Sequence, residues 1–173
     1  MNMDMYKEKN PLSVVLIALF DKNKILLAKR KRQPYKGFYG ILGGRQTFGM
    51  LTKHIVKKEV MEETGYTIKE DSIETRGLYS EILLDKEGKP KDHFIFRVCK
   101  AKVDKKVSEI LEKTDIENFE WFDLPLKKEV KKRIIPTDLI MLEHVLSDKK
   151  HDFKEFVTQE TENPNELKIV YSK

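Results

Sequence analysis

Residues 51–64 constrain the fold more than any other stretch of this chain. They hold many good helix formers and neither proline nor glycine, and Gly65 stands where a left-handed glycine commonly ends a helix. We therefore predict a helix from about Leu51 to Thr64. Strand-like segments lie on both sides of it, a pattern that favours a layered α/β fold.

The rest of the chain is predicted to be mostly strand. Apolar or alternating runs predict strands at residues 13–20, 25–28, 38–42, 72–84, 93–103 and 118–122. A second helix is predicted at 137–146, just after Pro136. Several glycines and a proline between 29 and 44 predict a loop that ends in a Gly43–Gly44 turn. Together these elements predict an α/β/α sandwich with a mixed β-sheet between helices.

A chain of 173 residues is long enough for one core and too short for two ordinary domains. We expect a single domain over residues 1–147 and a polar C-terminal tail over 148–173. Residues 167–171 of that tail could form an edge strand or dock on a second subunit, so a homodimer is left open.

Composition limits where such a protein works and what it binds. The longest apolar run, Val14–Phe20, is far shorter than a membrane-spanning helix, and the N-terminus has no signal-peptide pattern, so we expect a cytoplasmic protein without membrane contact. The 34 Lys and Arg are mixed with 29 Asp and Glu, which argues against a nucleic-acid-binding stripe and mildly favours small anionic ligands. The single cysteine, Cys99, lies in an apolar run typical of a buried side chain.

The predicted helix places three carboxylates on its apolar half. At about 100° per residue, Glu62 and Glu63 fall roughly 60° and 40° to either side of Glu59. Glu59 and Glu63 form a like-charge pair, and the last turn disfavours anions. A divalent cation such as Mg²⁺ would resolve this repulsion. The alternative from spacing alone is a solvated acidic patch in which Lys58 pairs with Glu62.

The residues around these carboxylates resemble a known motif. Gly44, Met50 and the run Lys58-Glu59-Val60-Met61-Glu62-Glu63-Thr64-Gly65-Tyr66 have the spacing of the Nudix box of the Nudix hydrolase family. The resemblance extends over about residues 11–147 and implies the Nudix fold. It also implies Mg²⁺- or Mn²⁺-dependent cleavage of a pyrophosphate linkage in a nucleotide substrate, closest to MutT-like (d)NTP pyrophosphatases. ADP-ribose or nucleotide-sugar hydrolysis is the alternative.

The same resemblance assigns candidate site residues. Glu59, Glu62 and Glu63 would be catalytic and bind the metal, with the Gly43 carbonyl and Asp115 as further metal ligands; Glu117 is the alternative to Asp115. Substrate contacts would come from Arg30 and Asp138. Arg30 could instead be a solvated member of the basic cluster 29–32, and Asp138 could instead cap the helix that follows Pro136.

Two positions depart from the family pattern. Met50 stands where a glutamate is expected, and Lys58 stands where an arginine is expected. A smaller departure is Leu42, where a proline commonly precedes the two glycines. Because the first two residues help relatives hold the catalytic helix, their replacement raises a further alternative, a catalytically weak or inactive nucleotide-binding module.

Overall fold

Strands are the main regular structure in the computed structural model, which describes residues 9–107, 116–147, 153–163 and 166–173. The strands are β1 (Leu12–Asp21), β2 (Lys24–Arg30), β3 (Tyr39–Gly40), β4 (Leu42–Arg45), β5 (Tyr66–Ile68), β6 (Glu74–Leu84), β7 (Pro90–Lys106), β8 (Ile116–Asp123), β9 (Lys154–Glu160) and β10 (Leu167–Ser172). The helical elements are α1 (Thr52–Thr64), the 3₁₀ turn η2 (Glu70–Ser72), α2 (Lys128–Lys131) and α3 (Pro136–Leu146). No helix in the described part of the chain is long and apolar enough to cross a membrane.

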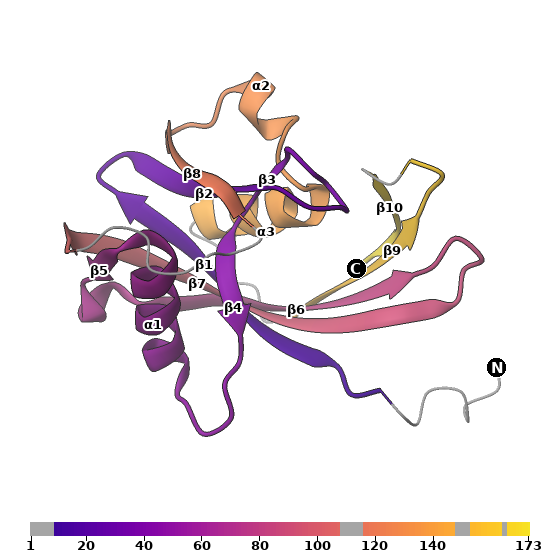
Figure 1. The fold of residues 1–173 in the computed structure, drawn as a ribbon, viewed down its shortest axis with the longest axis horizontal. Helices are drawn as coiled ribbons and strands as arrows, with labels where there is room; N and C mark the ends of the chain where they lie inside the picture. The colour runs from indigo at the N-terminus through magenta and orange to yellow at the C-terminus, as the bar shows by residue number, and fades with distance from the viewer. Residues whose placement is uncertain (1–8, 108–115, 148–152, 164–165) are drawn as a thin grey trace.

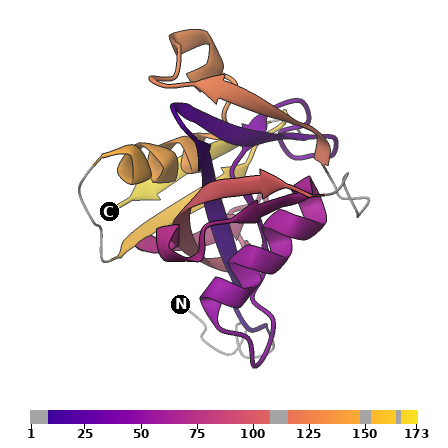
Figure 2. The same cartoon turned by 90° about the vertical axis from the view of Figure 1, so that its left-hand side faces the viewer.

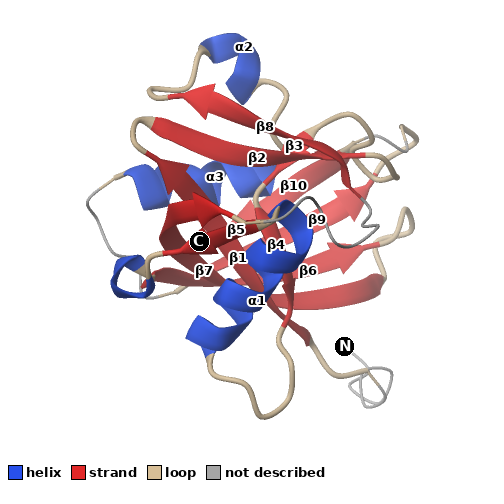
Figure 3. Cartoon of the chain, turned by 60° about the vertical axis from the view of Figure 1, so that its left-hand side comes forward, coloured by secondary structure: helices blue, strands red, loops and turns tan. Residues whose placement is uncertain are grey.

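The strands form one curled, mixed sheet (Figure 3). Its order is β10-β9-β6-β7-β1-β2-β3, with β4 paired to β1, β5 to β7 and β8 to β2. β1 pairs in parallel with β7 and antiparallel with β2 and β4. This arrangement confirms the predicted mixed sheet and makes β1 the central strand of the site region.

Alternation along β1 produces two cores, one on each face of the sheet. Leu16, Ala18 and Phe20 belong to the core that α3 covers. Val15, Ile17 and Leu19 belong to the core that α1 covers. Successive side chains of a strand point to opposite faces, so one apolar run can fill both layers. Figure 2 shows the two helices on opposite sides of β1 and β7, which is the predicted α/β/α sandwich.

The predicted helix at 51–64 is confirmed as α1. Gly65 has φ 72° and its N–H donates to the Met61 carbonyl, so this glycine ends the helix in the left-handed conformation. The second predicted helix is confirmed as α3, with Pro136 in its first turn. Both helices therefore begin and end close to where local sequence signals place them.

The prediction of a Gly43–Gly44 turn is wrong, because both glycines lie in strand β4. Gly43 stands opposite Leu16 in the β1–β4 ladder. A Cβ on Gly43 would lie 2.2 Å from the Val15 carbonyl oxygen. The glycine is thus required for close approach of two backbones rather than for a turn.

The core also extends past residue 147, where the sequence suggested that it ends. β9 pairs in parallel with β6, and β10 pairs with β9 as the edge strand (Figure 1). Phe156 is 1% exposed and joins the α3-side core. Strands β9 and β10 therefore add an antiparallel pair, the β9–β10 hairpin, to the sheet.

We predict that Phe156→Ala destabilises the fold by about 3–5 kcal/mol, because the Phe156 ring stacks 6.0 Å from Tyr79 and truncation leaves a cavity. Urea unfolding measures the change. Val170→Ala, at a position 45% exposed on β10, is the control and should change stability by less than about 0.5 kcal/mol. Equal effects of the two variants would contradict this role of the hairpin.

Candidate functional site

Strand β4 and helix α1 meet at Gly44 and Glu59. A Cβ on Gly44 would lie 2.2 Å from Oε2 of Glu59, so only glycine lets this carboxylate lie directly against the strand. The Glu59 side chain is 13% exposed. The contact fixes a mostly buried anionic group beside the β4 backbone, which is a costly arrangement unless positive charge or hydrogen bonds stabilise it.

Lys58 supplies positive charge to two of the three glutamates. Its ammonium lies 2.8 Å from Glu62 and 3.4 Å from Glu59, and the hydrogen bond to Glu62, followed by the attraction of Glu59, raises the pKa of Lys58. The Lys58–Glu62 pair is the one that the alternative of a solvated acidic patch predicts. The structure nevertheless brings the Glu59 and Glu62 carboxylates together around the Lys58 ammonium group.

The carboxylates have the donor chemistry that a divalent cation requires. Mg²⁺ and Mn²⁺ favour hard oxygen ligands, and Glu59 rests in a space that a Cβ on Gly44 would fill. Within the described residues, no three side chains of His, Cys, Asp or Glu lie in an arrangement that could hold a metal ion. Asp115 lies outside the described residues, and the Glu117 side chain is likewise not described.

Other contacts position α1 and the loop before it, where Met50 and Lys58 depart from the family motif. Met50 packs against the core beneath α1. The Gln46 amide donates to the Met50 carbonyl at 2.8 Å, and Arg97 of β7 donates to the Thr52 hydroxyl at the start of the helix. The first hydrogen bond therefore braces the loop before α1, and the second ties the start of the helix to the sheet.

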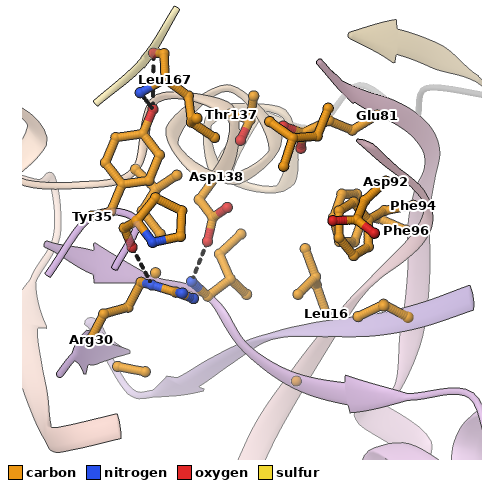
Figure 4. A pocket seen from close by; sticks show the side chains of 18 of the residues that line it. Leu16, Arg30, Tyr35, Glu81, Asp92, Phe94, Phe96, Thr137, Asp138 and Leu167 are labelled. Carbon is orange, nitrogen blue, oxygen red and sulfur yellow. Dashed lines mark hydrogen bonds between the residues drawn. The ribbon is translucent and has the colours of Figure 1, made fainter. Parts of the chain in front are cut away.

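A cavity of about 530 Å³ reaches Glu63, and Figure 4 shows the part of its lining around Arg30, Asp138 and Glu81. Glu63 and Gly43 line it together with Arg30 and Asp138. Its apolar lining includes Leu16, Leu83, Phe94 and Phe96. The structure thus brings four of the sequence-predicted site residues to one cavity, whereas Glu59 and Glu62 lie outside its lining.

Arg30 is at the end of β2 and is held in place by its own loop. Its Nε donates to the Pro34 carbonyl at 3.0 Å. The side chain is partly buried and lines the cavity. It therefore differs from a freely solvated member of the basic cluster.

Asp138 projects from α3 toward strands β3 and β4. Its carboxylate accepts a hydrogen bond from the Ile41 N–H at 2.8 Å, and α3 has no side-chain cap, so the capping alternative is wrong. Burial raises the pKa of Asp138 to about 7, against the opposing effects of the Ile41 N–H and Arg30, and Glu81 adds to the rise. The group can therefore exchange a proton near neutral pH.

The raised pKa predicts a pH-dependent stability. A carboxyl whose folded pKa exceeds its unfolded value stabilises the fold fully below about pH 4, and this contribution is lost as pH rises through about 7. Asp138→Asn cannot ionise, so its melting temperature should fall less than that of the wild type between pH 5 and 8. Thermal unfolding across this range measures the difference, and parallel profiles would contradict the assignment.

Sequence reasoning missed Glu81 and Tyr35, which also line the cavity. Glu81 is 8% exposed, and burial raises its pKa. Its signal was a charged residue at an inward position of an alternating strand, in register with Tyr79 and Leu83. Tyr35 gave no local signal, because its position depends on the loop after β2 and on strand β10.

Comparisons with known proteins match this architecture. The NUDIX domain model matches residues 9–138. Over 66 residues, the chain is 41% identical to the ADP-ribose pyrophosphatase of Methanocaldococcus jannaschii, a match that spans only 38% of either chain.

Two solved structures show the same fold. The mutator MutT protein of Bacillus halodurans superposes with a TM-score of 0.68 at 24% identity, over 94% of this chain and 96% of that one. A bifunctional NMN adenylyltransferase/ADP ribose pyrophosphatase of Francisella tularensis, complexed with AMP and a Mn ion, gives a TM-score of 0.60 at 19% identity, over 82% of this chain and 43% of that one. Since the domain model covers most of the chain and the fold agrees, this protein belongs to the NUDIX domain family.

Proposed function

We propose that this protein is a Mg²⁺- or Mn²⁺-dependent hydrolase that cleaves the pyrophosphate linkage of a nucleoside diphosphate derivative. The observation that carries the proposal is one cavity lined by Glu63 and Gly43 at one part and by Arg30 and Asp138 at others. One carboxylate and one backbone carbonyl that could help to hold a cation thus share a cavity with a cationic group suited to phosphate.

Each residue has a distinct role in this proposal. Glu59, Glu62, Glu63 and the Gly43 carbonyl would hold the divalent ion, with Asp115 as a further ligand. The bound cation would neutralise phosphate charge and lower the pKa of an attacking water. Glu59, fixed against Gly44, would accept the proton of that water. Arg30 would bind a substrate phosphate, and Asp138 would contact the base.

For the substrate we propose a (d)NTP, as in MutT-like pyrophosphatases. The fold likeness to the Bacillus halodurans MutT protein over nearly the whole of both chains is compatible with this choice. A small nucleotide also suits a cavity of about 530 Å³ whose lining combines apolar side chains with charged and polar ones. The protein would work in the cytoplasm, and a homodimer is left open.

ADP-ribose or a nucleotide sugar is the second candidate substrate. It is favoured by the 41% identity to an ADP-ribose pyrophosphatase, although that match spans 38% of the relative. A catalytically weak or inactive nucleotide-binding module is the third candidate, motivated by Met50 and Lys58. The hydrogen bond from Arg97 of β7 to Thr52, which ties the start of α1 to the sheet, argues for the active enzyme.

A substrate panel separates the three candidates. It contains (d)NTPs, oxidised (d)NTPs, ADP-ribose, nucleotide sugars, dinucleoside polyphosphates and coenzyme A, each assayed with Mg²⁺ and with Mn²⁺. Release of pyrophosphate from (d)NTPs supports the first candidate, and cleavage of ADP-ribose or nucleotide sugars supports the second. Thermal stabilisation by a nucleotide without turnover of any compound would leave the third.

A further inference from the structure

The β9–β10 hairpin lies beyond residues 9–138, the range of the family model, yet it forms part of the cavity wall. Leu167 and Glu160 of the hairpin both line the cavity. The nucleotide cavity of this chain is therefore built partly from a segment that the family model does not cover.

Three contacts fasten the hairpin to the cavity. The Tyr35 hydroxyl donates to the Leu167 carbonyl and accepts from the Leu167 N–H, both at 3.1 Å (Figure 4). Glu160 pairs with Lys91 of β7 at 2.5 Å, near the solvent-exposed side. The third contact, from Thr158, is buried and reaches Glu81 in the cavity.

Thr158 orients Glu81. The Thr158 side chain is 1% exposed and its hydroxyl donates to Oε1 of Glu81 at 2.8 Å. Burial raises the pKa of Glu81, and the hydroxyls of Thr158 and, to a lesser extent, Thr137 of α3 oppose this rise. Figure 4 shows Glu81 and Thr137 at the cavity, on the side of α3. The buried Thr158 hydroxyl thus fixes one oxygen of the Glu81 carboxylate.

A carboxylate held in this way selects its ligand by hydrogen bonding. It can only accept hydrogen bonds, so it attracts an amino group and repels a carbonyl oxygen. Glu81 faces Phe94 across the β6–β7 ladder, next to apolar lining that suits the flat face of a base. Glu81 belongs neither to the proposed metal site nor to the proposed phosphate site.

We propose that the β9–β10 hairpin is part of the substrate-binding site, and that Thr158 holds Glu81 as the acceptor for an exocyclic amino group on the nucleobase. This inference rests on the proposed function, because it assumes that the cavity takes a nucleotide. It makes Glu81 a specificity-determining residue and Thr158 a positioning residue.

The test uses AMP, GMP and IMP in calorimetry with the full chain. These monophosphates carry no pyrophosphate linkage, so binding is measured without turnover, and IMP has no exocyclic amino group. We expect the better of AMP and GMP to bind about tenfold or more tightly than IMP, since a site built for a donor rejects an analogue that lacks it.

Variants separate the specific role from a structural one. Thr158→Val removes the hydrogen-bond donor to Glu81 at nearly constant volume. It should reduce the preference for the better of AMP and GMP over IMP to about threefold or less, and Glu81→Gln should have the same effect. Thr158→Ser keeps the hydroxyl and should retain the wild-type preference. Tyr79→Phe is the matched control. It removes a partly buried 2.9 Å hydrogen bond between Tyr79, on the same strand as Glu81, and His144; Tyr79 is outside the cavity lining, so the variant should also retain the preference.

The outcomes distinguish this inference from the proposed function. No preference in the wild type, no binding of any monophosphate, or an unchanged preference in both Thr158→Val and Glu81→Gln would overturn the inference, even if (d)NTPs are hydrolysed. The expected changes in preference without hydrolysis of any compound in the substrate panel would uphold the inference and overturn the proposed hydrolysis.

Discussion

Glu62→Gln should lower the turnover of the substrate by about 10²–10⁴-fold, and Glu59→Gln should lower it nearly as far. Glutamine keeps the shape of each side chain but removes its negative charge, so the site would lose affinity for a divalent cation. In Glu59→Gln it would also lose the proposed proton acceptor. Steady-state kinetics at several Mg²⁺ concentrations measure both effects.

Glu70→Gln is the matched control for these variants. Glu70 also pairs with two lysines of α1, Lys53 at 3.1 Å and Lys57 at 2.8 Å, and these hydrogen bonds lower its pKa to about 2. It is therefore a glutamate held by the same helix but does not line the cavity. Turnover should stay near the wild-type value. Unchanged turnover in both Glu62→Gln and Glu59→Gln would refute the assignment of the site.

Gly44→Ala should lower turnover by about 10²-fold while leaving the fold intact, because an error of about 1 Å in the position of a reacting group can cost this much. The added Cβ would lie 2.2 Å from Oε2 of Glu59, at the far end of a flexible side chain. The Glu59 carboxylate can move aside, so the stability of the fold changes little. In doing so, the carboxylate leaves its position against the β4 backbone.

Gly43→Ala provides the contrast. Its added Cβ would meet the Val15 carbonyl at 2.2 Å, and this backbone atom is held in the β1–β4 ladder. We expect a loss of stability of about 1–3 kcal/mol or more, from forced separation of the two strands. Kinetics and thermal unfolding of both variants check the prediction. A large stability loss in Gly44→Ala with normal turnover of the folded fraction would contradict it.

Local signals predicted the parts of the fold that depend on local physics. Helix α1 ends at Gly65 because few other residues adopt a positive φ, and this signal is visible in the sequence. The placement of Glu59, Glu62 and Glu63 near one face follows from helical periodicity. These inferences needed only the spacing of neighbouring residues.

Parts that depend on distant neighbours were missed. Glycine serves both in turns and where backbones come close, and the sequence around Gly43 does not separate the two uses. The contact between Asp138 and Ile41 joins residues 97 positions apart and depends on the packing of α3. Strand β9 buries Phe156 and Thr158, and one of these two inward residues is polar, which weakens the alternation that would reveal a strand.

The pairing of β9 with β6 has a consequence for the order in which the protein matures. Tyr79 lies opposite Lys154 and Ser80 opposite Glu155, so this ladder joins segments that are synthesised far apart in time. Pairings between distant segments form slowly, because the entropy of closing a long loop is lost before the contacts between the strands can stabilise the fold. On a ribosome, helix α1 can fold while the chain still lacks one wall of its cavity. Selectivity would then be the last property that the nascent protein acquires.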